Sequence, residues 1–159
     1  MTMISEKKIV NWLAVKSDVN VKMFPERDEL TQLRLQKLLY FIQGTYLSLY
    51  DEKLFDDEIV HADYGPLAVK AHAKYEGKRK LNSLINWEQA LKDFSELNNI
   101  PKVSLVLNSV FNKYADVSTS KLVDITHHQK PWNSVKSGEE ISPKVLKEFF
   151  DNIVVQANA

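Results

Sequence analysis

The stretch that decides the fold runs from residue 31 to residue 46 and reads TQLRLQKLLYFIQGTY. Thr31 can cap a helix by accepting a hydrogen bond from its first turn. Helical spacing then gives one apolar row of Leu35, Leu38, Leu39, Ile42, Tyr46 and Leu49. A second row, about a hundred degrees away, holds Leu33, Tyr40, Gly44 and Leu47. Two apolar rows need two packing partners, so this helix is expected at the centre of the fold. Gly44 costs about 1 kcal/mol against Ala in mid-helix, and a close helix crossing there is expected to compensate.

Three polar residues, Gln36, Lys37 and Gln43, stand among these apolar rows. Gln36, Tyr40 and Gln43 lie within reach of one another at spacings of four and three residues. These groups either tie the helix to the Gly65-Pro66 turn through backbone hydrogen bonds or contact a ligand directly. We favour the structural role.

The convincing β signal is a small hairpin that follows the central helix. Residues 53–55 and 58–64 are expected to be extended, with a tight turn at Asp56-Asp57 between them. We interpret this acidic turn as solvated rather than as an acid/base pair. Gly65-Pro66 should end the hairpin, and Pro66 can be the first residue of the next helix.

Capping and breaking residues define the remaining helices. They predict helices from Ser5 to a break at 18–25, from Pro66 to near Gly77, from Asn86, from Pro101, from Ser118 or Thr119 to a break at 127–132, and from Ser142-Pro143. The sequence therefore predicts a mainly α fold: a compact single domain over residues 1–159, with six to seven helices around a central helix and one small β-hairpin.

Composition narrows the classes of function. The 159 residues are 44% hydrophobic and 26% charged, which are values of a globular chain. The 21 basic residues balance the 21 acidic ones, so nucleic-acid binding is not favoured. The chain has no cysteine, no apolar run of the roughly 18 residues of a membrane span and no signal-peptide core. A cytoplasmic protein is the expectation.

The histidines are the first residues to consider for chemistry. His61, Asp63 and His127 could assemble a metal site, but the pattern lacks HExxH and the hairpin residues are far in sequence from the His127-His128 pair. The alternative is that a histidine bonds a backbone carbonyl or a carboxylate at the end of its helix. Trp132 is interpreted as a core side chain rather than as a binding anchor. We also find no nucleophile motif or phosphate-binding loop, so neither an enzyme nor a cofactor is expected.

Three motifs in order resemble the Panacea domain family, also called SocA-like or phage-associated GepA-like. They are a Leu-Gln-Lys-Leu-Leu-Tyr-like helix, an aromatic-Gly-Pro segment, and a short helix that runs into Thr-His and then Trp. The residues that carry them here are Thr31, Leu35, Gln36, Lys37, Leu38, Tyr40, Gln43, Gly44, Tyr64, Gly65, Pro66, His127 and Trp132. The resemblance covers about residues 5–153.

The resemblance implies an antitoxin of a toxin–antitoxin system that neutralises a cognate protein toxin by forming a complex with it. One branch of the family acts instead as an adaptor that delivers its toxin to an AAA+ protease, and this remains an alternative. A metal-dependent enzyme built on His61, Asp63 and His127 is a second alternative, and a homo-oligomer is left open. The residues expected to contact the partner are Tyr64, Tyr75, Lys78, Arg79, Lys80 and Trp87.

Overall fold

The computed structural model describes residues 3–77 and 80–158, with side chains as far as residue 153. This part of the chain forms eight α-helices, one 3-10 turn and one two-stranded hairpin. In chain order they are α1 (Glu6–Met23), α2 (Gln32–Tyr50), β1 (Ile59–Ala62), β2 (Gly65–Ala68), α3 (Val69–Tyr75), a 3-10 turn (Asn82–Leu84), α4 (Trp87–Asn98), α5 (Pro101–Tyr114), α6 (Thr119–His127), α7 (Lys130–Asn133) and α8 (Pro143–Asn158). The mainly α prediction is confirmed, and the helix beyond the predicted number is the short α7. No helix of the described residues has the length and apolar character needed to cross a membrane.

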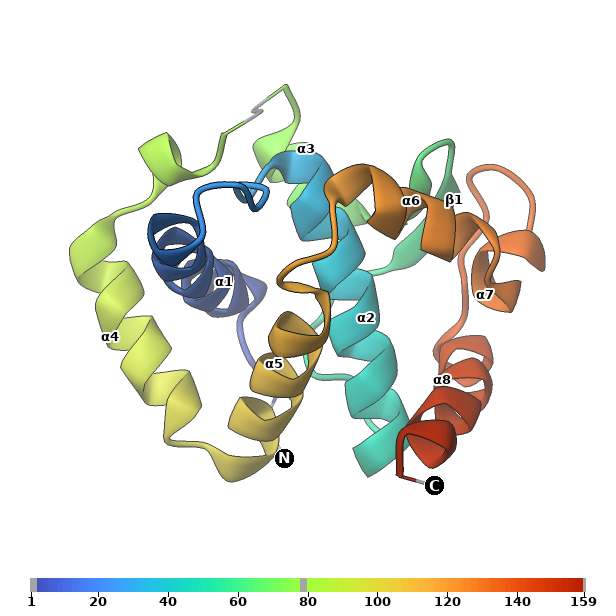
Figure 1. The fold of residues 1–159 in the computed structure, drawn as a ribbon. Helices are drawn as coiled ribbons and strands as arrows, with labels where there is room; N and C mark the ends of the chain where they lie inside the picture. The colour runs from blue at the N-terminus through green and yellow to red at the C-terminus, as the bar shows by residue number, and fades with distance from the viewer. Residues whose placement is uncertain (1–2, 78–79, 159) are drawn as a thin grey trace.

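Helix α2 lies at the centre, and α5, α6, α8 and the hairpin pack around it (Figure 1). The Thr31 hydroxyl accepts a hydrogen bond from the Arg34 amide at 3.1 Å, which confirms the predicted cap. Both apolar rows are buried from Leu35 to Leu47, whereas Leu33 in the first turn is half-buried. Leu49 was expected in the main buried row, but 40% of it is exposed, because it lies in the last turn of α2.

Gly44 marks a close crossing of α2 and α8, as its position in mid-helix predicted. A Cβ atom built on Gly44 would overlap the ring of Phe150. Phe150 also packs edge-on against Tyr40, with ring centroids 5.3 Å apart. The absence of a side chain at residue 44 therefore lets an aromatic ring seat directly on the α2 backbone.

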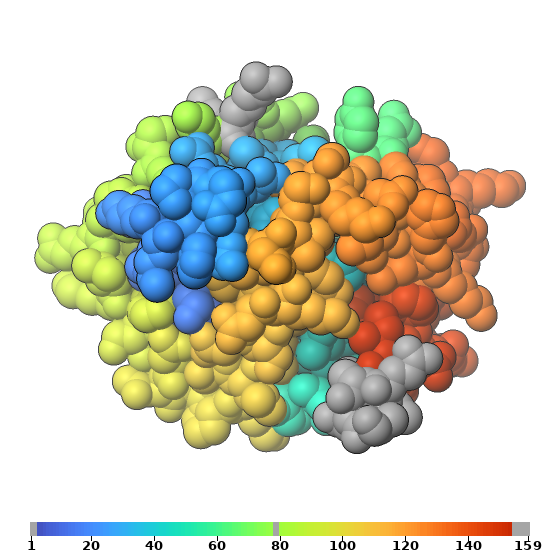
Figure 2. Space-filling model, viewed as in Figure 1, coloured from blue at the N-terminus to red at the C-terminus, as the bar shows by residue number. Residues whose placement is uncertain are grey.

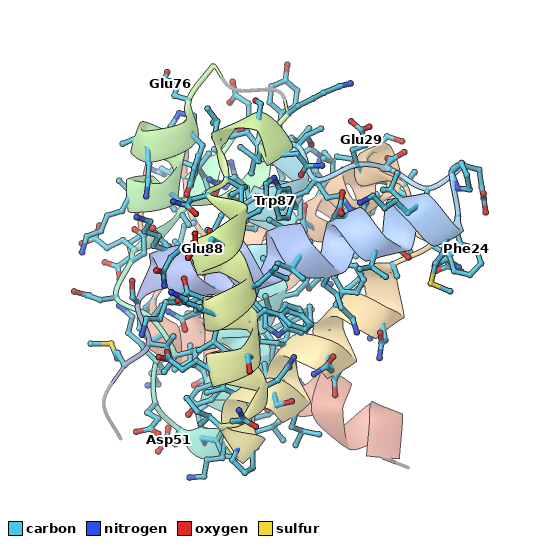
Figure 3. The ribbon with its side chains drawn as sticks, turned by 90° about the vertical axis from the view of Figure 1, so that its left-hand side faces the viewer. Phe24, Glu29, Asp51, Glu76, Trp87 and Glu88 are labelled. Carbon is cyan, nitrogen blue, oxygen red and sulfur yellow. The ribbon has the colours of Figure 1, made fainter. Side chains whose placement is uncertain are left out.

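Helices α1 and α4 cross face to face on the other side of the core (Figure 3). Trp12 stacks on Phe94 at 5.6 Å, and its indole N–H donates to Asn98 Oδ1 at 3.0 Å. The predicted break of α1 at 18–25 is wrong, since the helix continues to Met23. Asn20 is held in the helix by hydrogen bonds to Ala115 and Arg27, so the break comes only where Pro25 approaches.

The hairpin exists, but it lies later in the chain than predicted. Strands β1 and β2 pair antiparallel from Ile59 opposite Ala68 to Ala62 opposite Gly65, with the turn at Asp63-Tyr64. Pro66 therefore lies within a strand and does not begin a helix. Residues 53–55 form no strand, because the side chain of Gln43 satisfies the backbone there.

Candidate functional site

Side chains of α2 bind the outer edge of strand β2. The Lys37 ammonium donates to the Pro66 carbonyl at 3.0 Å, and the Gln36 side-chain oxygen accepts from the Ala68 amide at 2.6 Å. The other edge of β2 pairs with β1. Helix α2 thus supplies the hydrogen bonds that a third strand would make, and the link expected between Lys37 and the Gly65-Pro66 segment is present.

Lys37 is almost completely enclosed, with 1% of its surface exposed. This burial lowers the pKa of the Lys37 ammonium to about 7. Gly65 lies against it at φ +110°, a conformation that side chains strain, and a Cβ there would come 2.6 Å from Thr126 Oγ1. The packing of Lys37 and Thr126 therefore requires glycine at residue 65.

Gln43 and Tyr40 use the same helix to hold two other segments. Gln43 accepts from the Leu54 amide and donates to the Phe55 carbonyl, both at 2.8 Å. The Tyr40 hydroxyl donates to Gln129 Oε1 at 2.7 Å. Tyr40 therefore ties α2 to the connection between α6 and α7, and not to the hairpin as expected.

A stack of three rings fastens the hairpin to α6 and α7. The Trp132 ring lies 4.1 Å from that of His61 and 4.3 Å from that of His127. Its indole N–H donates to the Ala62 carbonyl at 2.8 Å. Trp132 is only partly buried, so the expectation of a core side chain is wrong. Its contacts instead connect strand β1 to helix α7, and we call this connection the Trp132 latch.

In His61, His127 and His128, one ring nitrogen faces a backbone carbonyl. His61 Nδ1 lies 2.7 Å from the Trp132 carbonyl, His127 Nε2 lies 3.1 Å from the Asp63 carbonyl, and His128 Nδ1 lies 2.8 Å from the carbonyl of residue 124. The nitrogen in this position donates a proton, and the other ring nitrogen of the same histidine stays available as an acceptor. Across residues 3–77 and 80–158, no three histidine, aspartate or glutamate side chains gather as metal ligands. The expected bond from a histidine to a backbone carbonyl at the end of its helix is therefore present, at His128.

The acidic turn is not fully solvated, contrary to our interpretation. Asp57 is 2% exposed, and its carboxylate accepts from the amides of Lys70 and Ala71 at 2.9 and 3.1 Å, so it caps α3. Glu6, in the first turn of α1, shares a hydrogen bond with Asp57. Burial and the neighbouring Asp57 carboxyl raise the pKa of Glu6 to about 8.

The residues expected to contact a partner do not form one patch. Tyr64 is 68% exposed in the hairpin turn, whereas Trp87 is 36% exposed at the start of α4, on the other side of α2 (Figures 1 and 3). Lys80 is exposed beside Glu29, at 3.5 Å. Tyr75 was wrongly expected at the surface: its ring is 6% exposed because α3 turns it into the core. Lys78 and Arg79 lie outside the described residues.

The structure adds a groove that the sequence did not reveal. It lies between α5 and α8 with α2 as its floor, has a volume of about 300 Å³, and is lined by Phe41, Thr45, Leu49, Leu105, Ser109, Val110, Lys113, Tyr114, Phe150 and Ile153. The space-filling view shows α2 between these two helices (Figure 2). We name it the α2–α5–α8 groove. One signal could have indicated it: Leu105 is an apolar residue outside the buried stripe of its own helix.

A known protein family matches the chain. Residues 35–133, which are more than half of the chain, match the family described as "Antitoxin SocA-like, Panacea domain". The matched region is narrower than the predicted 5–153 and leaves α1 and α8 outside it. Neither a curated protein nor a solved structure matched the chain. The matched region, residues 35–133, includes the α2 residues that bind β2, the hairpin itself and the ring stack at Trp132. The chain therefore belongs to the SocA-like Panacea antitoxin family.

Proposed function

We propose that this protein is the antitoxin of a toxin–antitoxin pair and neutralises its cognate protein toxin by forming a complex with it. The family match over residues 35–133 is the observation that carries this proposal. The protein then acts by binding and not by catalysis.

The interior contacts of the family motif support a binding role. Gln36, Lys37 and Gln43 are each 1% exposed and are hydrogen-bonded to the backbone of the hairpin and its preceding loop. A side chain enclosed in this way cannot touch a partner without unfolding of its surroundings. The motif therefore builds the scaffold, and the toxin must be recognised by other residues on the surface.

The surface is large enough for such a complex. A stable protein–protein interface takes roughly 800 Å² from each partner. The described surface measures 8350 Å², so about a tenth of it would be covered.

Co-expression tests the proposal. Each reading frame next to the gene of this protein is induced alone and together with it, in a host that lacks both. One product should stop growth alone, growth should return when this protein is present, and the two should co-purify from the rescued cells. Rescue without a complex, with toxin levels that fall only when an AAA+ protease is present, would contradict neutralisation by complex formation and indicate proteolytic delivery.

A further inference from the structure

The α2–α5–α8 groove is an apolar hollow that the packing of the described helices leaves open. Phe41, Val110 and Phe150, one from each of its three helices, line its buried part and are each at most 5% exposed. Leu105 and Leu49 stand at its edge with 55% and 40% of their surfaces exposed. Exposed apolar side chains around a hollow are typical of a site that receives another molecule.

The charges beside the groove indicate the nature of that molecule. The charged residues of α5 are Lys102 and Lys113, both basic and eleven residues apart, which is about 16 Å along a helix. Their ammonium groups lie over the rings of Tyr50 and Tyr114, at 4.9 and 5.5 Å from the centroids. Within the described residues neither lysine forms an ion pair.

Asp151, one of the two acidic residues of α8, does not compensate these charges. Asp151 of α8 accepts hydrogen bonds from Ser48 at 2.7 Å and from Lys147 at 3.2 Å. These two contacts lower the pKa of Asp151, so its negative charge is already stabilised by Ser48 and Lys147. The groove is therefore mainly apolar, with a lysine that forms no ion pair within the described residues toward each end of α5.

We propose that this groove receives an amphipathic helix of the cognate toxin. The apolar stripe of that helix fills the space over Phe41 and Phe150, and acidic residues toward its two ends face Lys102 and Lys113. A helix seated between two others on a common floor is an established mode of recognition, with anchors spaced three and four residues apart. This inference rests on the proposed function, because it identifies the surface that the antitoxin uses.

Two leucines provide a matched test. Leu105 on α5 and Leu91 on α4 are 55% and 57% exposed, so either can become glutamate at little cost to folding. Leu105→Glu should weaken toxin binding at least about tenfold, because it removes an apolar anchor and repels an acidic partner. Leu91→Glu should bind as wild type. Because Leu91 lies one turn from Trp87, the same pair also tests the α4 surface.

A second pair of variants adds a bulky side chain without adding charge. Ser109→Trp places an indole in the groove and should block the toxin helix, whereas Ser95→Trp, at an exposed serine of α4, should not. The toxin identified by co-expression is titrated into each purified variant by calorimetry. Thermal melting of the free variants checks that all four are folded.

The outcomes separate this inference from the proposed function. If both Leu105→Glu and Ser109→Trp bind the toxin as tightly as wild type, the proposal that the toxin occupies the groove is overturned and the antitoxin role stays intact. Loss of binding confined to Tyr64→Ala or Trp87→Ala would place the toxin on those residues instead. A free protein that is a dimer, and that Leu105→Glu dissociates, would show a second copy in the groove and overturn the toxin helix. Failure of wild type to bind any toxin would remove both proposals.

Discussion

Lys37 is the residue whose environment departs most from its ordinary one. Its folded-state pKa of about 7 lies below the value of 10.5 for a free lysine. Between these two pH values the unfolded chain binds more protons at this group than the folded one. The contribution of Lys37 to the free energy of unfolding therefore rises with pH, and it falls again as pH is lowered through the same range.

The variant Lys37→Met isolates this effect, because methionine is similar in length and carries no charge. Between about pH 7 and pH 9 the wild type should gain about 2 kcal/mol of unfolding free energy relative to Lys37→Met. Urea unfolding at a series of pH values measures the difference. Parallel pH profiles of the two proteins would show that the buried amine does not titrate in this range.

The contribution of Glu6 to stability depends on pH in the opposite direction. Its pKa is raised from 4.5 to about 8, so across this window the folded protein holds the extra proton and stability falls as pH rises. Glu6→Gln cannot ionise and keeps a donor for Asp57. Its melting temperature should exceed that of wild type above pH 8 and approach it near pH 5. The matched control is Glu88→Gln, which removes the first-turn glutamate of α4 and should leave the pH profile unchanged.

Gly44 sets two physical effects against each other. Helix propensity alone predicts that Gly44→Ala stabilises α2 by about 1 kcal/mol. The added methyl group would meet the Phe150 ring, and overpacking of this kind costs about 1–3 kcal/mol. We expect net destabilisation in urea unfolding, and partial recovery in the double variant Gly44→Ala with Phe150→Leu. A more stable Gly44→Ala protein would show that α2 and α8 do not cross closely there.

At the scale of elements, the hairpin depends on supports from both sides. Helix α2 binds the edge of β2, and residues 138–141 bind the edge of β1 through hydrogen bonds such as His61 N–H to the Glu139 carbonyl at 3.0 Å. Trp132 fastens the same strand to α7. A two-stranded hairpin is marginal by itself, so its order is a property of these neighbours.

Trp132 variants test this dependence. Trp132→Phe keeps a ring in the stack but loses the hydrogen bond to Ala62, and should cost about 1 kcal/mol. Trp132→Ala also loses the stack and should cost about 2 kcal/mol or more. Hydrogen exchange should accelerate at the His61 amide while α1 and α4 keep their protection. Equal acceleration across the molecule would contradict a local latch.

The same elements show how far the sequence could predict the fold. Helix α2 was predictable because its cap, its two apolar rows and Gly44 are local signals of strong periodicity. The hairpin lies later in the chain than predicted because long-range hydrogen bonds determine its position. Gln43 binds the backbone of residues 53–55 and keeps them out of a strand, and Lys37 of α2 donates to the carbonyl of Pro66 within β2. Tyr75 and Asp57 were misplaced for a similar reason, since their burial depends on how α3 docks.

At the scale of the whole molecule, the family match and the fold do not have the same extent. Helices α1 and α8 lie outside residues 35–133, yet Trp12 and Phe150 are fully buried parts of the core. The groove proposed for the toxin combines α2 and α5, within the matched region, with α8 outside it. Leu105 was a local signal of this groove, but it could not locate the groove, which exists only where three separate helices meet.

The central claim is that this protein neutralises its toxin by holding it in a complex. The most direct measurement mixes the purified toxin with the purified protein, with no protease present, and follows toxin activity and complex formation together. We predict that activity falls in proportion to the complex and reaches its minimum at a fixed molar ratio. Full toxin activity in the presence of excess folded protein would contradict the claim.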